Sequence, residues 1–336
     1  MALISTSDVA NSLFLRRSTT VLKERLAQAR QEMTTGRAAD PVSALRGRTA
    51  PLAALERNRS QLDAYAIATA ETRLHTEAQQ RALGRVGAAT ADTFGQILAL
   101  GPAPGAHMVD PVARDARGAF EQSVIALNTR LAERSLFSGA AGDRPALAPA
   151  SDILAALVAE TAGATTAAEV VALVDAWFDT SGGGFESVGY RGSVVPAGPV
   201  AIAEGETLQL AITAARDELR PALKGLALAA LVAEDVPGSG HEERAALLET
   251  AGLRLMQAQS GVIALAAELG ASEARIAAAG VRNTAERTAM ESAVNDLIGI
   301  DPFEAATRLE DTRGRIEALF SITGRLQRLS LTEFLR

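Results

Sequence analysis

The side chains best suited to chemistry are three histidines, His75, His107 and His241. An imidazole can act as a general base near neutral pH, or bind a metal ion. The three lie far apart in the sequence, and none has a second histidine at the spacing of helical metal ligands. We therefore interpret them as ordinary helix-surface or loop residues, and we predict no metal site.

Other catalytic patterns are missing from the sequence as well. It contains no Gly-x-Ser-x-Gly elbow, no glycine-rich dinucleotide fingerprint and no phosphate-binding loop. With no cysteine, it cannot form thiolate zinc sites, iron–sulfur clusters or a cysteine nucleophile. The glycines at 182–184 precede no expected helix, so we interpret them as a flexible link. We expect no enzymatic activity and no cofactor; a hydrolase hidden in the middle of the chain would need a converging acid–base pair.

The composition favours helices. The 336 residues include 48% hydrophobic side chains but only 4% aromatic ones. Alanine and leucine make up the difference, and both are strong helix formers. A large aromatic-lined ligand pocket is hard to build from this supply. The composition predicts long helices that pack through small and branched side chains.

The charge pattern excludes several classes of partner. The formal net charge is −7, although residues 1–60 hold twice as many basic as acidic side chains. We interpret that basic segment as a solvated helix face, because it lacks the aromatic residues or the module of a nucleic-acid binder. The first fifteen residues lack the basic start of a secretory signal, and the uncharged stretches are too short to span a bilayer. We predict no nucleic-acid partner, no cleaved signal peptide and no membrane insertion.

Capping residues predict where helices begin. An aspartate followed by proline combines a good N-cap with a residue suited to the first helical position, and a Ser/Thr three residues before Glu can form a capping box. The first pattern occurs at Asp40, Asp110 and Asp301, and the second at Thr166 with Glu169 and at Ser239 with Glu242. Residues 41–100 and 241–299 each read as one long helix. Helices of this length predict a rod or bundle.

Both ends of the chain carry apolar residues at heptad-like spacing. Such stripes favour side-by-side helices, and each is too short to be stable alone. We therefore expect the ends to pack on each other or on neighbouring subunits. The residues predicted to form this assembly interface are Leu15, Leu22, Leu26, Met33, Leu309, Ile316, Leu319 and Leu326.

The middle of the chain has a different pattern. Residues 188–195 and 199–210 contain the valines and glycines of short strands, and Glu204 with Gly205 forms the expected turn. Residues 152–161, 166–179 and about 217–232 are predicted to be helices. The middle therefore reads as a small α+β unit inserted between two helical halves.

Four stretches of the sequence resemble a known family. They are Ile4–Ser7 with Gln31–Arg37 before Asp40; Asn128 and Thr129 followed by Leu136–Gly139 (Leu-Phe-Ser-Gly); Tyr190–Gly192 with Leu223–Leu231; and Ile316–Leu335. In this order and spacing they resemble the flagellin superfamily, and within it the flagellin-like hook-associated proteins of the hook–filament junction. Departures from the pattern include Ala132–Arg134, where a glycine is common, and a paucity of Asn and Gln.

This resemblance implies a structural role. Members are exported unfolded through the flagellar type III apparatus, after binding a cytoplasmic chaperone. Outside the cell, their terminal helices pair in a ring or tube of identical subunits. The junction proteins link the hook, through a companion hook-associated protein, to the flagellin filament.

We therefore expect a mainly α protein, an elongated discontinuous helical rod or coiled coil formed by both chain ends, with a small inserted α+β domain. The expected division is paired terminal helices at 1–40 and 301–336, a rod at 41–145 and 236–300, and an outer insertion at 146–235. The expected function is that of an extracellular structural subunit at the hook–filament junction. Flagellin itself and a secreted coiled-coil effector remain as alternatives.

Overall fold

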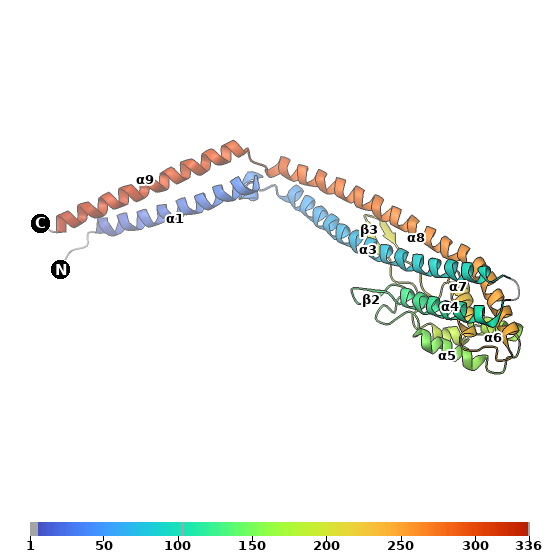
Figure 1. Cartoon of the computed structure of the whole chain (residues 1–336). Coiled ribbons are helices and arrows are strands. Elements are labelled where there is room, and N and C mark those ends of the chain that lie inside the picture. The colour runs from blue at the N-terminus through green and yellow to red at the C-terminus, as the bar shows by residue number, and fades with distance from the viewer. Residues whose placement is uncertain (1–5, 102–103, 335–336) are drawn as a thin grey trace. The chain divides into compact units, whose positions relative to one another are not determined.

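The computed structural model describes residues 6–101 and 104–334, with side-chain surroundings given from Leu13 to Arg325 apart from residues 102–103. The chain divides into two compact units, residues 1–63 with 284–336, and residues 64–283. The predicted mainly α class, with a small inserted α+β part, is confirmed (Figure 1). No helix in the described ranges combines the length and apolarity that a membrane span requires.

Long helices dominate both units. The helices are α1 Thr6–Thr35, α2 Pro41–Ala44, α3 Ala50–Ala99, α4 Ala106–Leu127, α5 Ala150–Glu160, α6 Ala167–Asp179, the π-helical turn η1 Phe185–Gly189, α7 Arg220–Val232, α8 His241–Ile298 and α9 Pro302–Phe334. The long helix predicted over 241–299 is confirmed as α8. The helices predicted at 152–161, 166–179 and 217–232 are confirmed as α5, α6 and α7.

Two short hairpins complete the element list. Strands β1 (Arg130–Leu131) and β2 (Arg134–Ser135) pair antiparallel. Strands β3 (Val200–Ala203) and β4 (Glu206–Leu208) also pair antiparallel, around the predicted turn. The second hairpin packs its buried Ile202 and Leu208 on Ile276 of α8. In addition, the Asn283 amide donates a 2.8 Å hydrogen bond to the Ile202 carbonyl, which fixes the hairpin on the helix.

Three predicted N-caps are confirmed. Asp40 accepts hydrogen bonds from the Ser43 hydroxyl and from the backbone N–H groups of Ser43 and Val42, and these bonds lower the pKa of its carboxyl group. Asp301 accepts from the Phe303 N–H at the start of α9. Thr166 and Glu169 form the predicted reciprocal capping box of α6.

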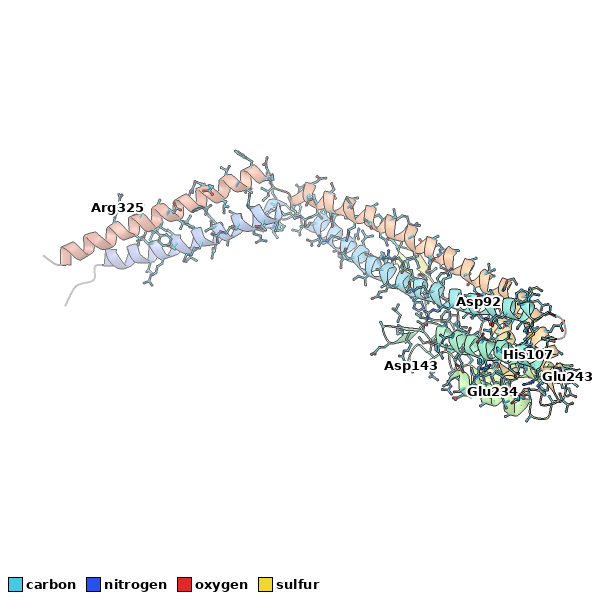
Figure 2. All side chains as sticks on the ribbon, viewed as in Figure 1. Asp92, His107, Asp143, Glu234, Glu243 and Arg325 are labelled. Atoms are coloured by element: carbon cyan, nitrogen blue, oxygen red, sulfur yellow. The ribbon has the colours of Figure 1, made fainter. Side chains whose placement is uncertain are left out.

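Two other predicted helix starts are wrong. Helix α4 begins five residues before Pro111, after Gly105, because the added turn buries Val109 completely. Ser239 does not cap α8; its hydroxyl donates to the Thr165 carbonyl instead. Glu243, at the start of α8, accepts a 2.7 Å hydrogen bond from the Ala167 N–H and so caps α6 (Figure 2).

The single helix predicted over 41–100 is also wrong. It is divided into α2 and α3 by a turn in which Arg46 and Gly47 have φ values of 51° and 78°. A helix cannot continue through two residues in the left-handed region. The sequence does mark this turn, with Gly47 and with Pro51 in the first turn of α3, where proline is favoured.

The strand predicted at 188–195 is replaced by η1 and an irregular loop. Tyr190 forms one isolated bridge with Leu147, and the backbone of the following residues binds the 138–148 segment. The three glycines at 182–184 are not a loose link, because a Cβ on Gly184 would overlap the Trp177 indole. Close packing against a ring explains that glycine.

One hydrophobic core lies within residues 64–283. It connects the two packed helices α4 and α7, and it includes nearly every residue of α7. Four of the chain's few aromatic residues, Trp177, Phe178, Phe185 and Tyr190, gather in it with ring centroids 4.8–6.3 Å apart. The rest of the core is largely Ala and Leu, which allows the helices to approach closely.

Candidate assembly site

The two ends of the chain pack against each other as a pair of helices. Helices α1 and α9 run side by side in the first unit (Figure 1). Near the end of the pair where α1 terminates and α9 begins, Ala29 and Ala305 are buried, at 5% and 1% exposure. Small side chains at these positions let the two helices approach closely.

Six of the residues predicted to form the assembly interface lie half-buried on this helix pair. They are Leu15, Leu22, Leu26, Leu309, Ile316 and Leu319. Met33 is 47% exposed, and the side chain of Leu326 lies outside the described residues. The pairing of the chain ends within one copy therefore already covers much of these stripes. Their role in contacts between copies stays a prediction.

A second set of apolar side chains on the same helices is left exposed. Phe14 is 69% exposed, Phe320 55% and Phe303 82%. Among the residues of α1 and α9 whose side chains the structure describes, the exposed large apolar ones besides Met33 are Leu13, Phe14, Val21, Phe303, Phe320 and Ile322. Sequence reasoning missed these residues because it followed the heptad stripes alone.

The sequence does hold a signal for this exposed set. Phe14 stands next to Leu15, Val21 next to Leu22, and Phe320 next to Leu319. Neighbouring residues on a helix point about 100° apart. When one member of each pair lies in the contact between α1 and α9, the other therefore points away from it. Adjacent apolar pairs in a two-helix unit therefore predict an exposed apolar face beside the seam.

A backbone clasp holds the inner end of the pair. Gly36 has a φ of 68°, which ends α1, and its N–H donates to the Glu32 carbonyl. Arg37 bridges Gly299, and the Ala38 N–H donates a 2.8 Å bond to the Ile298 carbonyl. The end of the Gln31–Arg37 stretch noted in the sequence therefore joins the turn after α1 to the connection between α8 and α9.

Charged groups line a groove between the two helices. Glu32 lies 3.7 Å from the Arg308 guanidinium and accepts a hydrogen bond from the Ala39 N–H. Asp311 pairs with Arg315 at 2.9 Å. The groove has a volume of about 310 Å³ and is mostly polar. The groove therefore adds ion pairs to the contact between α1 and α9, and it offers no apolar cavity for a ligand.

In the second unit, the Leu-Phe-Ser-Gly stretch anchors the inserted segment. Leu136 and Phe137 are buried in the core, and the Ser193 N–H donates to the Ser138 carbonyl at 2.8 Å. Gly139 has a φ of 61°, and a Cβ there would overlap the carbonyl oxygens of Ser193 and Val195. The motif therefore needs its glycine for backbone contact, a structural role.

Asn128 performs a similar structural task. Its side-chain amide donates to the Leu147 carbonyl, and its side-chain oxygen accepts from the Leu147 N–H at 2.8 Å. Both bonds go to one backbone position, so the amide fixes the return of the chain after the β1–β2 hairpin. The asparagine of the family pattern is thus accounted for by folding.

The buried charges of the second unit are paired with one another. Lys224 of α7 is 6% exposed and contacts Asp175 at 2.9 Å and also Asp179, both from α6. Arg254 of α8 binds Asp175 at 2.8 Å. This network ties three helices together, and its carboxylates are engaged by cations.

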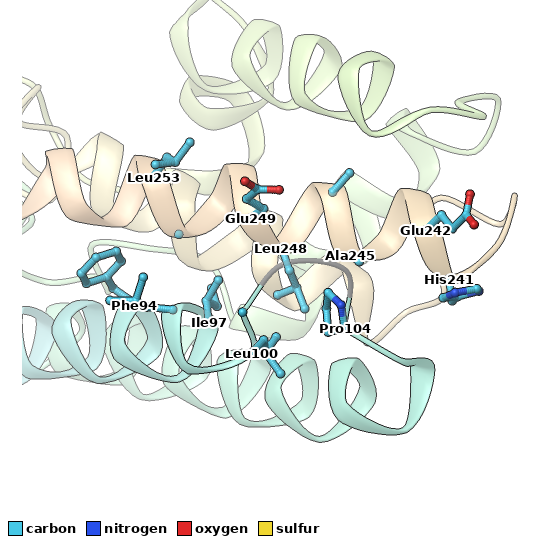
Figure 3. A pocket seen from close by; sticks show the side chains of 14 residues that line it. Phe94, Ile97, Leu100, Pro104, His241, Glu242, Ala245, Leu248, Glu249 and Leu253 are labelled. Carbon is cyan, nitrogen blue, oxygen red and sulfur yellow. The ribbon is translucent and has the colours of Figure 1, made fainter.

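A hollow of about 640 Å³ lies between the end of α3 and the start of α8. Figure 3 shows Phe94, Ile97 and Leu100 on one wall and Leu248 and Leu253 on the other. His241, Glu242 and Glu249 also line it. His107 is exposed and His75 is half-buried. Within the described ranges, no three His, Cys, Asp or Glu residues gather as a metal site would require.

The chain has two informative matches among known proteins. Residues 254–335 match the family model of the bacterial flagellin C-terminal helical region. The structure is similar to that of a "putative flagellar hook-associated protein" from Vibrio parahaemolyticus, with a TM-score of 0.53, 14% identity, and coverage of 77% of this chain and 98% of that one. No curated protein matches the chain.

The two matches differ in what they show. At 14% identity, the structural match shows a shared fold, whereas the family model identifies a sequence region that includes most of α8 and all of α9. The carboxyl-terminal part of this chain is thus a region of the flagellin C-terminal type, on a fold shared with a flagellar protein.

Proposed function

We propose that this chain is a non-catalytic structural subunit of a bacterial flagellum, which assembles with copies of itself through its terminal helices. One observation carries the proposal: the helix that matches the flagellin C-terminal region, α9, exposes Phe303, Phe320 and Ile322. A monomeric protein gains nothing from large apolar side chains in water, whereas a polymer can bury them.

The energetics favour completion of this surface by other copies. Burying one such side chain contributes about 1.5–3 kcal/mol. A pair of helices buries only one stripe of each, so its remaining apolar residues need a further layer. Neighbouring subunits of a ring or tube would supply that layer.

The more specific proposal is a place at the hook–filament junction, outside the cell. In that role the chain would be exported through the type III apparatus without a cleaved signal, after binding a cytoplasmic chaperone. It would contact a companion hook-associated protein and flagellin. Support comes from the sequence resemblance and from the similarity to a protein described as hook-associated.

Flagellin is the second candidate. It is favoured by the family model, which describes the C-terminal helical region of bacterial flagellin itself. Deletion of the gene separates the two candidates. Loss of a junction protein should release unpolymerised flagellin into the medium, whereas loss of flagellin should remove the filament protein altogether. Immunolabelling of isolated flagella should mark only the hook–filament boundary for a junction protein, and the whole filament for flagellin.

The assembly surface is tested by Phe320→Ser. Phe320 is more than half exposed, so the monomer should keep its circular dichroism spectrum while sedimentable polymer and filament attachment are lost. The matched control is Val195→Ser, an equally exposed apolar residue of the second unit, at 61% exposure. Normal assembly of the Phe320 variant would exclude this surface, and labelling of a non-flagellar structure would exclude the flagellar role.

A further inference from the structure

The solvent side of α8 carries a long uncharged stripe, here called the α8 outer face. Its positions alternate in steps of three and four residues, the spacing of a coiled-coil seam. They are Leu253, Met256, Ser260, Ile263, Ala267, Gly270, Ala274, Ala277 and Val281, all exposed except the half-buried Gly270. Ile263 and Val281 are 67% and 72% exposed. The buried stripe of α8, which includes Leu255, Val262 and Leu269, lies on the opposite side.

The charges of this part of α8 are turned away from the outer face. Arg254 binds Asp175, Glu268 binds Arg216 at 3.1 Å, and Arg275 lies 3.4 Å from Glu206. Among residues 253–281 only Glu273 has no ion-pair partner in the described structure. A helix face kept free of charge over about 42 Å differs from an ordinary solvated surface.

Helix α3 carries a stripe of the same spacing and similar length, here called the α3 outer face. Its positions are Ile67, Ala70, Leu74, Glu77, Arg81, Gly84, Ala88, Ala91, Gly95 and Leu98, all exposed except the half-buried Glu77. Ile67, Leu74 and Leu98 are 62%, 50% and 67% exposed. Small residues occupy most of the other positions, which leaves room for a partner's larger side chains.

The two outer faces are complementary when they are aligned antiparallel, with Leu253 opposite Leu98. Large residues of α8 then meet small ones of α3: Met256 opposite Gly95, Ile263 opposite Ala88, and Val281 opposite Ala70. Large residues of α3 likewise meet small ones of α8: Arg81 opposite Gly270, Glu77 opposite Ala274, and Leu74 opposite Ala277. A parallel alignment would place Ile263 against Glu77 and would leave a run of small residues facing small residues.

Charge supports the same register. Arg81 has no ion-pair partner in the part of the chain that the structure describes, and Glu273 stands beside Gly270 on α8. In the antiparallel alignment these two free charges of opposite sign come together. Within one copy, Val262 faces Gly87 and Ile97 faces Gly252, which is nearly the same register. Two copies could therefore lie side by side with almost no shift of one relative to the other along the helix axis.

We propose that the α8 outer face of one copy binds the α3 outer face of a second copy, antiparallel, as a lateral contact between subunits. The proposal rests on the self-assembly proposed above and adds a surface outside the terminal helices. Each copy offers both faces, so the contact is heterologous and repeats around a ring or along a tube. One helix pair buries less than the roughly 800 Å² per partner of a stable complex, so two free copies would associate weakly.

Cross-linking tests the contact directly, because the chain contains no cysteine. One population carries Ile263→Cys and the other Ala88→Cys, both at exposed positions. Mixed under assembly conditions and oxidised, they should form a covalent dimer, whereas each variant alone should not. The out-of-register control pairs Ile263→Cys with Ile67→Cys, on the same face but about 31 Å away along the helix. That mixture should assemble without forming a covalent dimer.

The outcomes separate this contact from the assembly role. Polymers that form without the 263–88 cross-link would overturn the contact and leave the assembly role standing, and so would dimers of Ile263→Cys with itself. Cross-linked dimers that never sediment as polymer would support the contact and overturn the assembly role. Absence of both cross-link and polymer would overturn both.

A charge exchange tests the register. Arg81→Glu in the population carrying Ala88→Cys should lower the cross-linking yield about two- to fivefold, as expected for one exposed ion pair. Glu273→Arg in the other population should restore the yield. Failure of the second change to restore it would overturn the antiparallel register.

Discussion

The terminal helix pair and the body formed by residues 64–283 bury their apolar residues to very different extents. In the body, Phe120, Phe137 and Leu127 are at most 1% exposed. In the pair, Leu15, Leu22 and Ile316 remain half-buried, and whole phenylalanines are exposed beside them. Both regions are helical, so secondary structure alone does not account for the difference.

The number of packed layers accounts for it. In the body, α4, α5, α6 and α7 meet one another, and an apolar side chain leaving one helix finds a second and a third. In the pair, α1 has α9 as its neighbour, so only the shared seam is covered. A region with two helices and more than one apolar stripe per helix has an incomplete core, which other subunits can complete.

The largest expected effect is a difference in unfolding free energy between a substitution in the body and one in the helix pair. Phe120→Ala should lower the free energy of unfolding of the body by about 3–5 kcal/mol, because it removes a ring buried on all sides. Leu22→Ala in the pair should cost about 1–2 kcal/mol, because part of that side chain is already in water. Urea unfolding followed by circular dichroism measures both. Equal losses would contradict the contrast.

A second prediction concerns how tightly the body is packed. Gly184→Ala should destabilise it by about 1–3 kcal/mol, because the new methyl group must displace the Trp177 ring. Trp177 is the sole tryptophan, so its fluorescence should shift with the substitution. The control is Gly163→Ala, where a Cβ meets nothing within 4 Å. An unchanged emission spectrum for the Gly184 variant would argue against this packing.

The smallest effect concerns pH. Burial lowers the pKa of His75 below its ordinary 6.5, and nearby Arg134 lowers it further, against a hydrogen bond to Leu136 that raises it. The unfolded chain therefore binds the proton more tightly. Stability of the body is greatest above pH 6.5 and falls as the pH drops through 6.5 toward the lowered pKa of the folded state.

His75→Gln should remove that part of the acid destabilisation, and His107→Gln, at an exposed position, should not. Thermal unfolding at pH 7.5 and pH 5.5 measures the difference. The helix pair contains no histidine, so its own unfolding should lack this component. The same slope in wild type and the His75 variant would show that His75 does not contribute.

Local signals were sufficient for much of the fold. The Asp40, Thr166 and Asp301 caps and the turn at Glu204 and Gly205 depend on side-chain and backbone chemistry within a few residues. Contacts between distant segments were not predictable in this way. Gly184 packs on Trp177, Ser239 binds Thr165, and Tyr190 lies along Leu147, so the sequence around each of them suggested another structure.

The sequence by itself determined that α3 and α8 are long helices with stripes of constant spacing, because helix propensity and periodicity are local properties. It did not determine which stripe of α3 faces inward. The outer face holds Ile67 and Leu74, whereas the buried face holds Thr69, Thr72 and Gln79.

The tertiary structure decided between these two faces. The Thr69 and Thr72 hydroxyls donate to the carbonyls of Tyr65 and Ala68 in their own helix, so they can be buried without another partner. The Gln79 amide donates to the Leu136 carbonyl at 2.7 Å. With these bonds the polar side chains can pack in the interior beside Leu83 and Val86, and Ile67 and Leu74 are left on the outside.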